Sequence, residues 1–434
     1  MSSRKLLDAL RESINNRVMR GTMSLILGSA AAKAIGLAVM PLLTRLYAPE
    51  DFGRLSFFVS ITTIIGSILT LRYVVALPIP KSGRRARALL LINTLLITAT
   101  MLLVAALLIS AASSSARTVI MNHFDDFWLK YWWLIPVGAT GFAFYELLTM
   151  WATREKKYAV ISRSQVWQSV SGTAVKVSGG FLLPGPLSLV LGQLVQQSGG
   201  ILGMLSSYLK ALKQASLEYR LQHLLLVFKR YLEFAYYKLP SHFIYGFAAQ
   251  TPILFSSYMW GSSTTGQLGL AFQAIALPLM LISQNASRVY YAELAAISKG
   301  DRAAALKLTK YMAARLFGIG LVIGMLLFAI APMAFVIAFG KTWTEAGELA
   351  RALSIYIPFQ FVASPLIMAY NIYGNQRQVL ILHCIRAALV TSVFFACHTM
   401  NLGALSTIYI YSIVISLHYS FVFFDVVRSI RKQR

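Results

Sequence analysis

Acidic residues and cysteine are both scarce in this chain. Asp and Glu number 15 against 40 Lys and Arg, and only 13% of the 434 residues are charged whereas 57% are hydrophobic. This composition excludes an ordinary soluble globular protein. Cys384 and Cys397, the only cysteines, lie in one apolar stretch, about 20 Å apart along a helix. Neither a disulfide framework nor a cysteine zinc site is therefore expected.

Motifs of enzyme chemistry are also missing. Gly340-Lys341-Thr342 resembles the end of a phosphate-binding loop, but Phe335 stands where the motif requires its first glycine. The histidines show no metal-ligand spacing. No loop between the apolar stretches is long enough for a folded catalytic domain. The sequence therefore predicts neither an enzyme nor a metal or organic cofactor.

Long apolar stretches dominate the chain, and twelve of them can cross a hydrocarbon core of about 30 Å. They lie at 23–46, 55–78, 88–111, 132–152, 165–183, 186–208, 236–258, 265–292, 312–336, 353–372, 379–398 and 404–425. An even number of spans places both termini on the same side of the membrane.

The net charge of +25 would suggest a nucleic-acid partner in a soluble chain. Here most Lys and Arg fall in the segments on the side of the termini. The loops on the other side contain few cations: Arg54, Arg117, Lys130, Lys341 and Arg351. By the positive-inside rule both termini are predicted to be cytoplasmic, and no nucleic-acid partner is expected.

Two halves of the chain resemble each other. Residues 46–56 (LYAPEDFGRLS) and 259–269 (MWGSSTTGQLG) follow the first span of each half, and they align Gly53 with Gly266. Further matches lie at nearly the same offset: Arg72 with Arg288, and 81–84 with 299–302. An even number of spans per half makes the two repeats parallel.

The repeat predicts the domain organisation. Residues 1–208 form an N-lobe and residues 233–434 a C-lobe, each with six helices, and an interfacial linker helix at 209–232 lies along the cytoplasmic membrane surface. In transporters of this design the substrate site lies between the lobes. We therefore expect an all-α membrane protein with twelve transmembrane helices in two six-helix lobes around a central cationic cavity, working by alternating access.

Positive charges within the predicted spans indicate what this cavity binds. Each costs about 2.5–3.5 kcal/mol at the bilayer centre, so such residues usually face protein or water. Lys33, Lys176 and Arg288 have small or polar neighbours on their helix faces. Arg72 has aliphatic neighbours and is included because it matches Arg288. These four cations are predicted to bind an anionic substrate.

Other residues are candidates for substrate contact or for a gate. Arg45, Lys238 and Arg386 lie near predicted helix ends, where snorkelling to the interface is an equal alternative. The polar candidates are Gln284, Asn285 and Gln250. Glu146 is the only acid well inside a predicted span; it either pairs with one of the cations, which we favour, or serves a coupling ion.

Short motifs along nearly the whole chain resemble one family. They are Arg45-Leu46-Tyr47 with Pro49-Glu50-Asp51-Phe52-Gly53, Leu71-Arg72-Tyr73 with Ala76-Leu77-Pro78, Leu191-Gly192-Gln193, Phe339-Gly340 with Trp343 and Ala346, and Ser364-Pro365. This pattern resembles the Wzx-type polysaccharide flippases of the multidrug/oligosaccharidyl-lipid/polysaccharide exporter superfamily. One position departs from it: the family often has Glu two residues after the arginine that matches Arg72, and here Val74 stands there.

The resemblance implies a function. Such a protein flips undecaprenyl-pyrophosphate-linked oligosaccharide units from the cytoplasmic to the periplasmic leaflet of the bacterial inner membrane, for O-antigen, capsule or exopolysaccharide synthesis. Expected partners are the lipid-linked glycan, membrane lipids and a polymerase of the same pathway, and the protein is expected to be a monomer. Membrane potential, protons or sodium are the candidate driving forces.

Two alternatives remain open. A multidrug exporter of the same superfamily has the same architecture but binds cationic drugs, which require carboxylates within the membrane. A membrane polysaccharide polymerase or ligase acts on the same lipid, but it requires a large extracytoplasmic loop with catalytic residues.

Overall fold

A computed structural model describes residues 3–113, 126–218, 221–232, 236, 238–297, 301–373 and 376–432. The regular elements in these residues are all helical. Contacts divide the chain into two compact units: unit 1 comprises Met1–Met40 and Ile61–Pro240, and unit 2 comprises Pro41–Ser60 and Ser241–Arg434. The predicted linker at 209–232 thus falls within unit 1, while residues 41–60 belong to unit 2. Arg117, His123, Lys299 and Gly300 lie outside the described residues.

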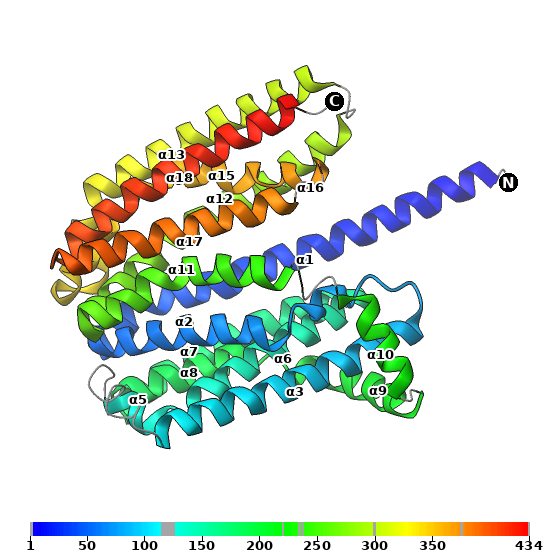
Figure 1. Ribbon diagram of the computed structural model, residues 1–434, viewed down its shortest axis with the longest axis horizontal. Helices are drawn as coiled ribbons and strands as arrows, with labels where there is room; N and C mark the ends of the chain where they lie inside the picture. Colours follow the sequence, from blue (N-terminus) through cyan, green and yellow to red (C-terminus); the bar gives the residue numbers. More distant parts are fainter. Residues whose placement is uncertain are drawn as a thin grey trace. The chain divides into compact units, whose positions relative to one another are not determined.

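Unit 1 contains the helices that precede Pro240, except for the end of α1 and the start of α2. Its elements are α1 (Ser3–Leu46, up to Met40), α2 (Pro49–Leu69, from Ile61), the 3-10 helix η1 (Tyr73–Ala76), α3 (Gly83–Ser113), α5 (Asp126–Tyr131), α6 (Leu134–Arg154), α7 (Tyr158–Leu182), α8 (Pro186–Ser198), α9 (Leu202–Glu218) and α10 (Leu221–Arg230). Helices α9 and α10 pack against α3 (Figure 1). The Thr94 and Tyr208 hydroxyls lie 3.0 Å apart, and the Tyr73 ring stacks on Phe228 at 5.0 Å.

Unit 2 contains the remaining helices. They are α11 (Leu239–Met259), α12 (Gly261–Ala296), α13 (Arg302–Phe339), the 3-10 helix η3 (Lys341–Trp343), α14 (Thr344–Ser354), α15 (Ile357–Leu366), α16 (Ala369–Tyr373), α17 (Gln376–Thr399) and α18 (Ala404–Lys432). Helices α13 and α18 run side by side (Figure 1). Close packing of α13 on α15 depends on Gly320, where an added Cβ would lie 2.8 Å from Pro358 Cα.

Eight described helices are long and apolar enough to cross a membrane. They are Met23–Leu46, Pro49–Leu69, Gly83–Leu107, Leu134–Arg154, Gly261–Ala296, Arg302–Phe339, Arg377–Thr399 and Ala404–Lys432. A ninth candidate is the pair Lys341–Ser354 and Ile357–Tyr373, which is bent by 56°. The chain is therefore a multi-pass membrane protein, and each of these segments overlaps a predicted span.

Three predicted spans fall outside this set, so the count of twelve stays a prediction. The stretch 186–208 is not one continuous helix, because α8 ends at Ser198 and α9 begins at Leu202. Gly199 and Gly200 lie at this break, and a Cβ on Gly200 would come within 2.7 Å of the Tyr145 ring. The stretches 165–183 and 236–258 lie on α7 and α11, whose described residues are less apolar.

The two glycines aligned by the repeat meet inside unit 2. A Cβ on Gly53, in α2, would overlap the carbonyl oxygen of Ser262, and a Cβ on Gly266, in α12, would overlap the carbonyl oxygen of Pro49. Each glycine therefore allows the backbone at the start of one helix to touch the start of the other. The matching turns of the repeat form a reciprocal contact.

Motif residues that are distant in sequence surround this contact. Trp343 Nε1 donates to the Thr44 carbonyl at 3.1 Å, and the Trp343 ring packs edge-on against Phe52 at 5.0 Å. The Gln267 amide donates to the Thr342 carbonyl at 2.7 Å and accepts from the Ala346 N–H at 3.0 Å. Motif residues used for the resemblance thus converge on one buried junction.

Candidate functional site: cations inside the two units

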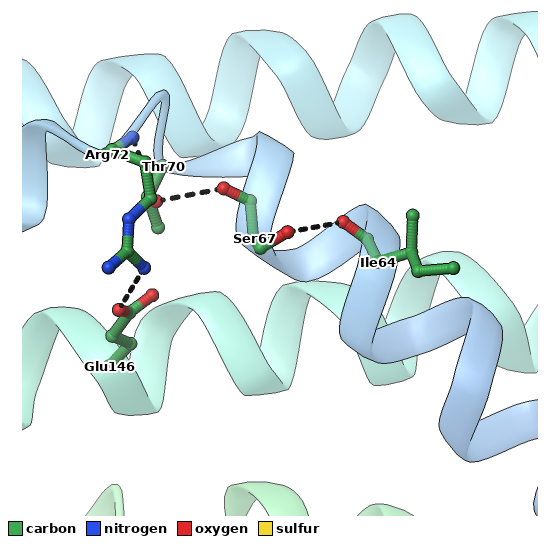
Figure 2. A network of polar contacts seen from close by, with 5 residues as sticks. All are labelled: Ile64, Ser67, Thr70, Arg72 and Glu146. Atoms are coloured by element: carbon green, nitrogen blue, oxygen red, sulfur yellow. Dashed lines mark hydrogen bonds and ion pairs between the residues drawn. The ribbon is translucent and has the colours of Figure 1, made fainter. Parts of the chain in front are cut away.

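Arg72 pairs with Glu146 inside unit 1 (Figure 2). Helix α2 ends at Leu69, and both Leu71 (φ 43°) and Arg72 (φ 59°) adopt left-handed backbone conformations. The Thr70 hydroxyl accepts from the Arg72 N–H at 3.3 Å and supports this reversal. The guanidinium then reaches α6, where Nη1 donates to Glu146 Oε1 at 2.8 Å.

The pair is partly buried, with side-chain exposures of 16% for Arg72 and 19% for Glu146. A single hydrogen bond joins them, since Arg72 Nε and Glu146 Oε2 have no partner among the described residues. Glu146 supplies from α6 the carboxylate that Val74 cannot provide. The pairing favoured from the sequence is thus present in the structure, and it neutralises both charges.

Lys176 lies in the contact between α7 and α8 and is 7% exposed. Its amine donates to Gln193 Oε1 and to Gln196 Oε1, each at 2.7 Å. Two glycines allow the helices to approach: a Cβ on Gly172 would lie 2.5 Å from Gln196 Cβ, and a Cβ on Gly192 would overlap the Lys176 side chain. Two neutral amides therefore hold this cation inside unit 1.

Most of the remaining candidates lie exposed on helix surfaces, and Gln250 makes a hydrogen bond within unit 2. Exposed side chains are those of Lys33, Arg45, Lys238, Gln284, Asn285 and Arg288. Arg288, Gln284 and Asn285 share an exposed polar strip of α12. Gln250 is half-buried and accepts from the Ser60 hydroxyl at 2.9 Å. Three of the four predicted cavity cations belong to unit 1, and Arg288 belongs to unit 2.

Arg386, on α17, lies in an aromatic environment in unit 2. Its Cζ atom lies 5.5 Å from the Tyr245 ring centroid and 5.6 Å from that of Tyr419. The guanidinium also hydrogen-bonds the Tyr411 hydroxyl, and Tyr356 lies close by. Arg386 Nε is buried without a hydrogen-bond partner, and no carboxylate pairs with this arginine in the described part of unit 2. Cation–π and hydroxyl contacts stabilise the charge but do not neutralise it.

Snorkelling, which the sequence left open for Arg386, does not describe this arrangement. The guanidinium lies among tyrosine rings from α11 and α18 instead of reaching a helix end. Tyr411 and Tyr419 are eight residues apart and share a face of α18. That spacing was visible in the sequence, but 21 tyrosines gave no reason to select these two.

Asp425 is a partly buried acid in a hydrogen-bond network, and the sequence interpretation missed it. The predicted span ended at this position, but α18 continues to Lys432, so Glu146 is not the only acid within a membrane-length helix. Asp425 accepts hydrogen bonds from the Tyr370 hydroxyl and, at 2.9 Å, from the Gln378 amide. These partners tie α16 and α17 to α18.

Solved structures show which fold the chain has. The lipid II flippase MurJ in an inward closed conformation superposes with a TM-score of 0.69 at 14% identity, covering 95% of this chain and 89% of that one. An inward-facing multidrug resistance MATE family transporter of the MOP superfamily gives 0.67 at 15%, covering 96% and 98%. An outward-facing structure described in the same terms gives 0.60 at 13%, covering 95% and 96%. The chain has a fold similar to that of these MOP-superfamily transporters.

The family follows from the sequence match. A family model described as polysaccharide biosynthesis protein matches residues 42–348, and the chain belongs to this family. No curated protein matches the chain. The resemblance drawn from the short motifs is therefore confirmed for the family and for the superfamily fold.

Proposed function

We propose that this protein flips an undecaprenyl-pyrophosphate-linked oligosaccharide from the cytoplasmic to the periplasmic leaflet of the bacterial inner membrane by alternating access. Membership of a polysaccharide biosynthesis family supports a glycan cargo, and the MOP-superfamily fold supports transport. One similar structure is a lipid II flippase, which supports a lipid-linked cargo. In this proposal α7, α8 with α9, and α11 complete twelve spans, and both termini are cytoplasmic.

The observation that carries the proposal is the un-neutralised charge of Arg386. Its neighbours are tyrosine rings and hydroxyls, whereas Glu146 is already paired with Arg72. Among these membrane-embedded groups, a positive charge is therefore left over. A pyrophosphate diester carries about two negative charges and cannot enter hydrocarbon without compensation. A positively charged interior supplies that compensation.

Exposed cations on membrane-spanning helices provide a second line of support. Lys33 and Arg288 are exposed on helices that are long and apolar enough to span a membrane. A charged side chain in that setting faces water or protein, because facing lipid is costly. In our proposal these two side chains contact the phosphates or acidic sugars during passage. Lys176 contributes charge from within unit 1, whereas the pair of Arg72 with Glu146 holds the segment after α2 to α6.

The multidrug exporter is the weaker candidate. Cationic drugs require an accessible carboxylate, and Glu146 is paired with Arg72 while Asp425 accepts from Tyr370 and Gln378. An anionic cargo also has a driving force. Each negative charge that moves outward lowers the electrostatic free energy by about 2.3 kcal/mol per 100 mV of inside-negative potential. Two charges therefore release roughly 4–5 kcal/mol at about 100 mV. Protons or sodium are further candidates for coupling.

Reconstitution tests this function. The purified protein is placed in liposomes with lipid-linked oligosaccharide, and the fraction of glycan accessible to an external glycosidase is followed over time. An inside-negative potential is expected to accelerate outward flipping without ATP. The control cargo is a polyprenyl-linked sugar that lacks the pyrophosphate, and it is expected not to flip. Equal rates for both cargoes, with and without potential, would overturn the proposal.

A further inference from the structure

A basic pocket lies wholly within unit 1, away from the cations discussed above. It has a volume of about 890 Å³ and opens where α6 ends. Its walls are the 78–83 segment before α3, the turn between α6 and α7, and one face of α9. Six cations line it: Lys81, Arg87, Arg154, Lys156, Lys157 and Lys210. Glu155 is the only acid among its lining residues.

Arg154 fixes the wall in front of α3. Its Nη1 donates to the Pro80 carbonyl at 2.6 Å and to the Leu77 carbonyl at 3.4 Å, and its Nη2 donates to the Ser82 carbonyl at 3.4 Å. These bonds attach the segment between η1 and α3 to the end of α6. The backbone that presents Lys81 is therefore held in place.

Glu155 makes its contacts within the opposite wall of the pocket. Its Oε2 lies 2.8 Å from Lys157 Nζ and accepts from the Ser207 hydroxyl at 2.6 Å. Lys157 Nζ also donates to the Ser207 hydroxyl at 3.1 Å. This triad ties the turn after α6 to α9. The single carboxylate is thus satisfied by its own wall and does not offset the other lysines.

Three lysines remain without a partner. Lys81, Lys156 and Lys210 come from three separate segments, are exposed, and make no hydrogen bond or ion pair with any described residue. Like charges that converge on one hollow repel each other and attract an anion. We propose that this pocket binds the phosphate group of an acidic membrane lipid, a function separate from the proposed flipping.

Two observations favour a lipid phosphate over a soluble one. The volume is in the range of sites for groups larger than a free phosphate ion. Leucines are exposed on α9, which lines the pocket, and on α10, which packs with α9 against α3: Leu202 and Leu209 are 76% and 50% exposed, and Leu225 and Leu226 are 50% and 67% exposed. An acyl chain along these leucines with its headgroup in the pocket satisfies both surfaces.

Native mass spectrometry of the purified full-length protein tests this site. Phosphatidylglycerol is the lipid probe, phosphatidylcholine is the net-neutral lipid and ADP is the soluble phosphate ester. The pocket variant is Lys81→Gln with Lys210→Gln. Its matched control is Lys229→Gln with Arg230→Gln, which removes two exposed cations from α10 outside the pocket. Thermal unfolding verifies that each variant is folded.

We expect the pocket variant to bind phosphatidylglycerol about thirtyfold more weakly than wild type. The control variant keeps wild-type binding, and phosphatidylcholine binding is unchanged in both. Loss of ADP binding alone in the pocket variant would retain the phosphate site but overturn the lipid as its source. If the pocket variant bound both phosphatidylglycerol and ADP as tightly as the control variant does, the site itself would be overturned.

Discussion

Arg72 in unit 1 and Arg386 in unit 2 are held inside their units in opposite ways. Arg72 meets a carboxylate at 2.8 Å, whereas Arg386 meets tyrosine rings at 5.5 and 5.6 Å. A carboxylate cancels the charge and leaves a structural tie. Aromatic faces and hydroxyls lower the cost of the charge while preserving it for an incoming anion. In the function that we propose, this difference distinguishes Arg72, which holds helices together, from Arg386, which attracts the cargo.

The backbone conformations at Arg72 and Arg386 also differ. Arg72 lies three residues after the end of α2 in a left-handed conformation, and its side chain reaches Glu146 on α6 (Figure 2). Arg386 lies ten residues into the regular helix α17. Removal of Arg72 therefore frees a chain reversal, whereas removal of Arg386 leaves the backbone of its helix intact.

The largest expected effect is on transport by Arg386→Gln. Loss of the positive charge is expected to slow flipping by about 100-fold, equivalent to roughly 2.7 kcal/mol, while membrane insertion and protein level remain at wild-type values. Arg386→Lys keeps the charge and is expected to retain part of the rate. The flipping assay in liposomes measures this. Arg377→Gln removes an exposed cation from the same helix and serves as the control. If Arg386→Gln flipped its cargo at the wild-type rate, Arg386 would have a structural role, as Arg72 does.

The next effect is on stability, and it concerns Arg72 and Glu146. Removal of one partner leaves a partly buried charge, so Arg72→Ala and Glu146→Ala are each expected to lower the free energy of unfolding by roughly 2–3 kcal/mol. The double variant is expected to lose less than the sum, by about 1–2 kcal/mol. Unfolding in detergent with increasing SDS measures these differences. Lys33→Ala, at an exposed position of α1, is the control and is expected to be neutral. Strictly additive losses would show that the pair contributes no coupling.

Sequence patterns predicted the features that depend on local signals. Hydropathy located the eight membrane-length helices, and the repeat aligned the glycines that meet in unit 2. The pairing of Glu146 was anticipated but its partner was not, because the contact depends on the left-handed reversal at Leu71 and Arg72. No periodicity encodes such a reversal when neither residue is glycine.

Features that depend on long-range contacts were missed. The setting of Arg386 requires tyrosines from α11 and α18 together with Tyr356, which are far apart in the chain. The basic pocket likewise combines Lys81, Lys156 and Lys210 from separate segments. The sequence predicted cytoplasmic loops for Lys81 and Lys156 and an interfacial linker helix for Lys210. Only the fold shows which of them face the same hollow.

Lys176 lies between the two extremes, because neutral amides hold its charge. Lys176→Met replaces the amine with an apolar chain of similar length and removes the cost of a buried charge. It also leaves the Gln193 and Gln196 oxygens, each now 2.7 Å from the amine, without that donor. We expect these effects to offset partly, so that the free energy of unfolding falls by about 1 kcal/mol.

The triple variant Lys176→Met, Gln193→Leu and Gln196→Leu separates the two contributions. It removes the charge and the two glutamine acceptors, and an apolar replacement of a buried charge together with its partners is often neutral or stabilising. Its stability is therefore expected to return to the wild-type value, measured by SDS unfolding. Flipping by Lys176→Met is expected to stay within about fivefold of wild type, equivalent to 1 kcal/mol. A 100-fold loss with unchanged stability would instead group Lys176 with Arg386, because only a charge that acts on the cargo affects transport without affecting the fold.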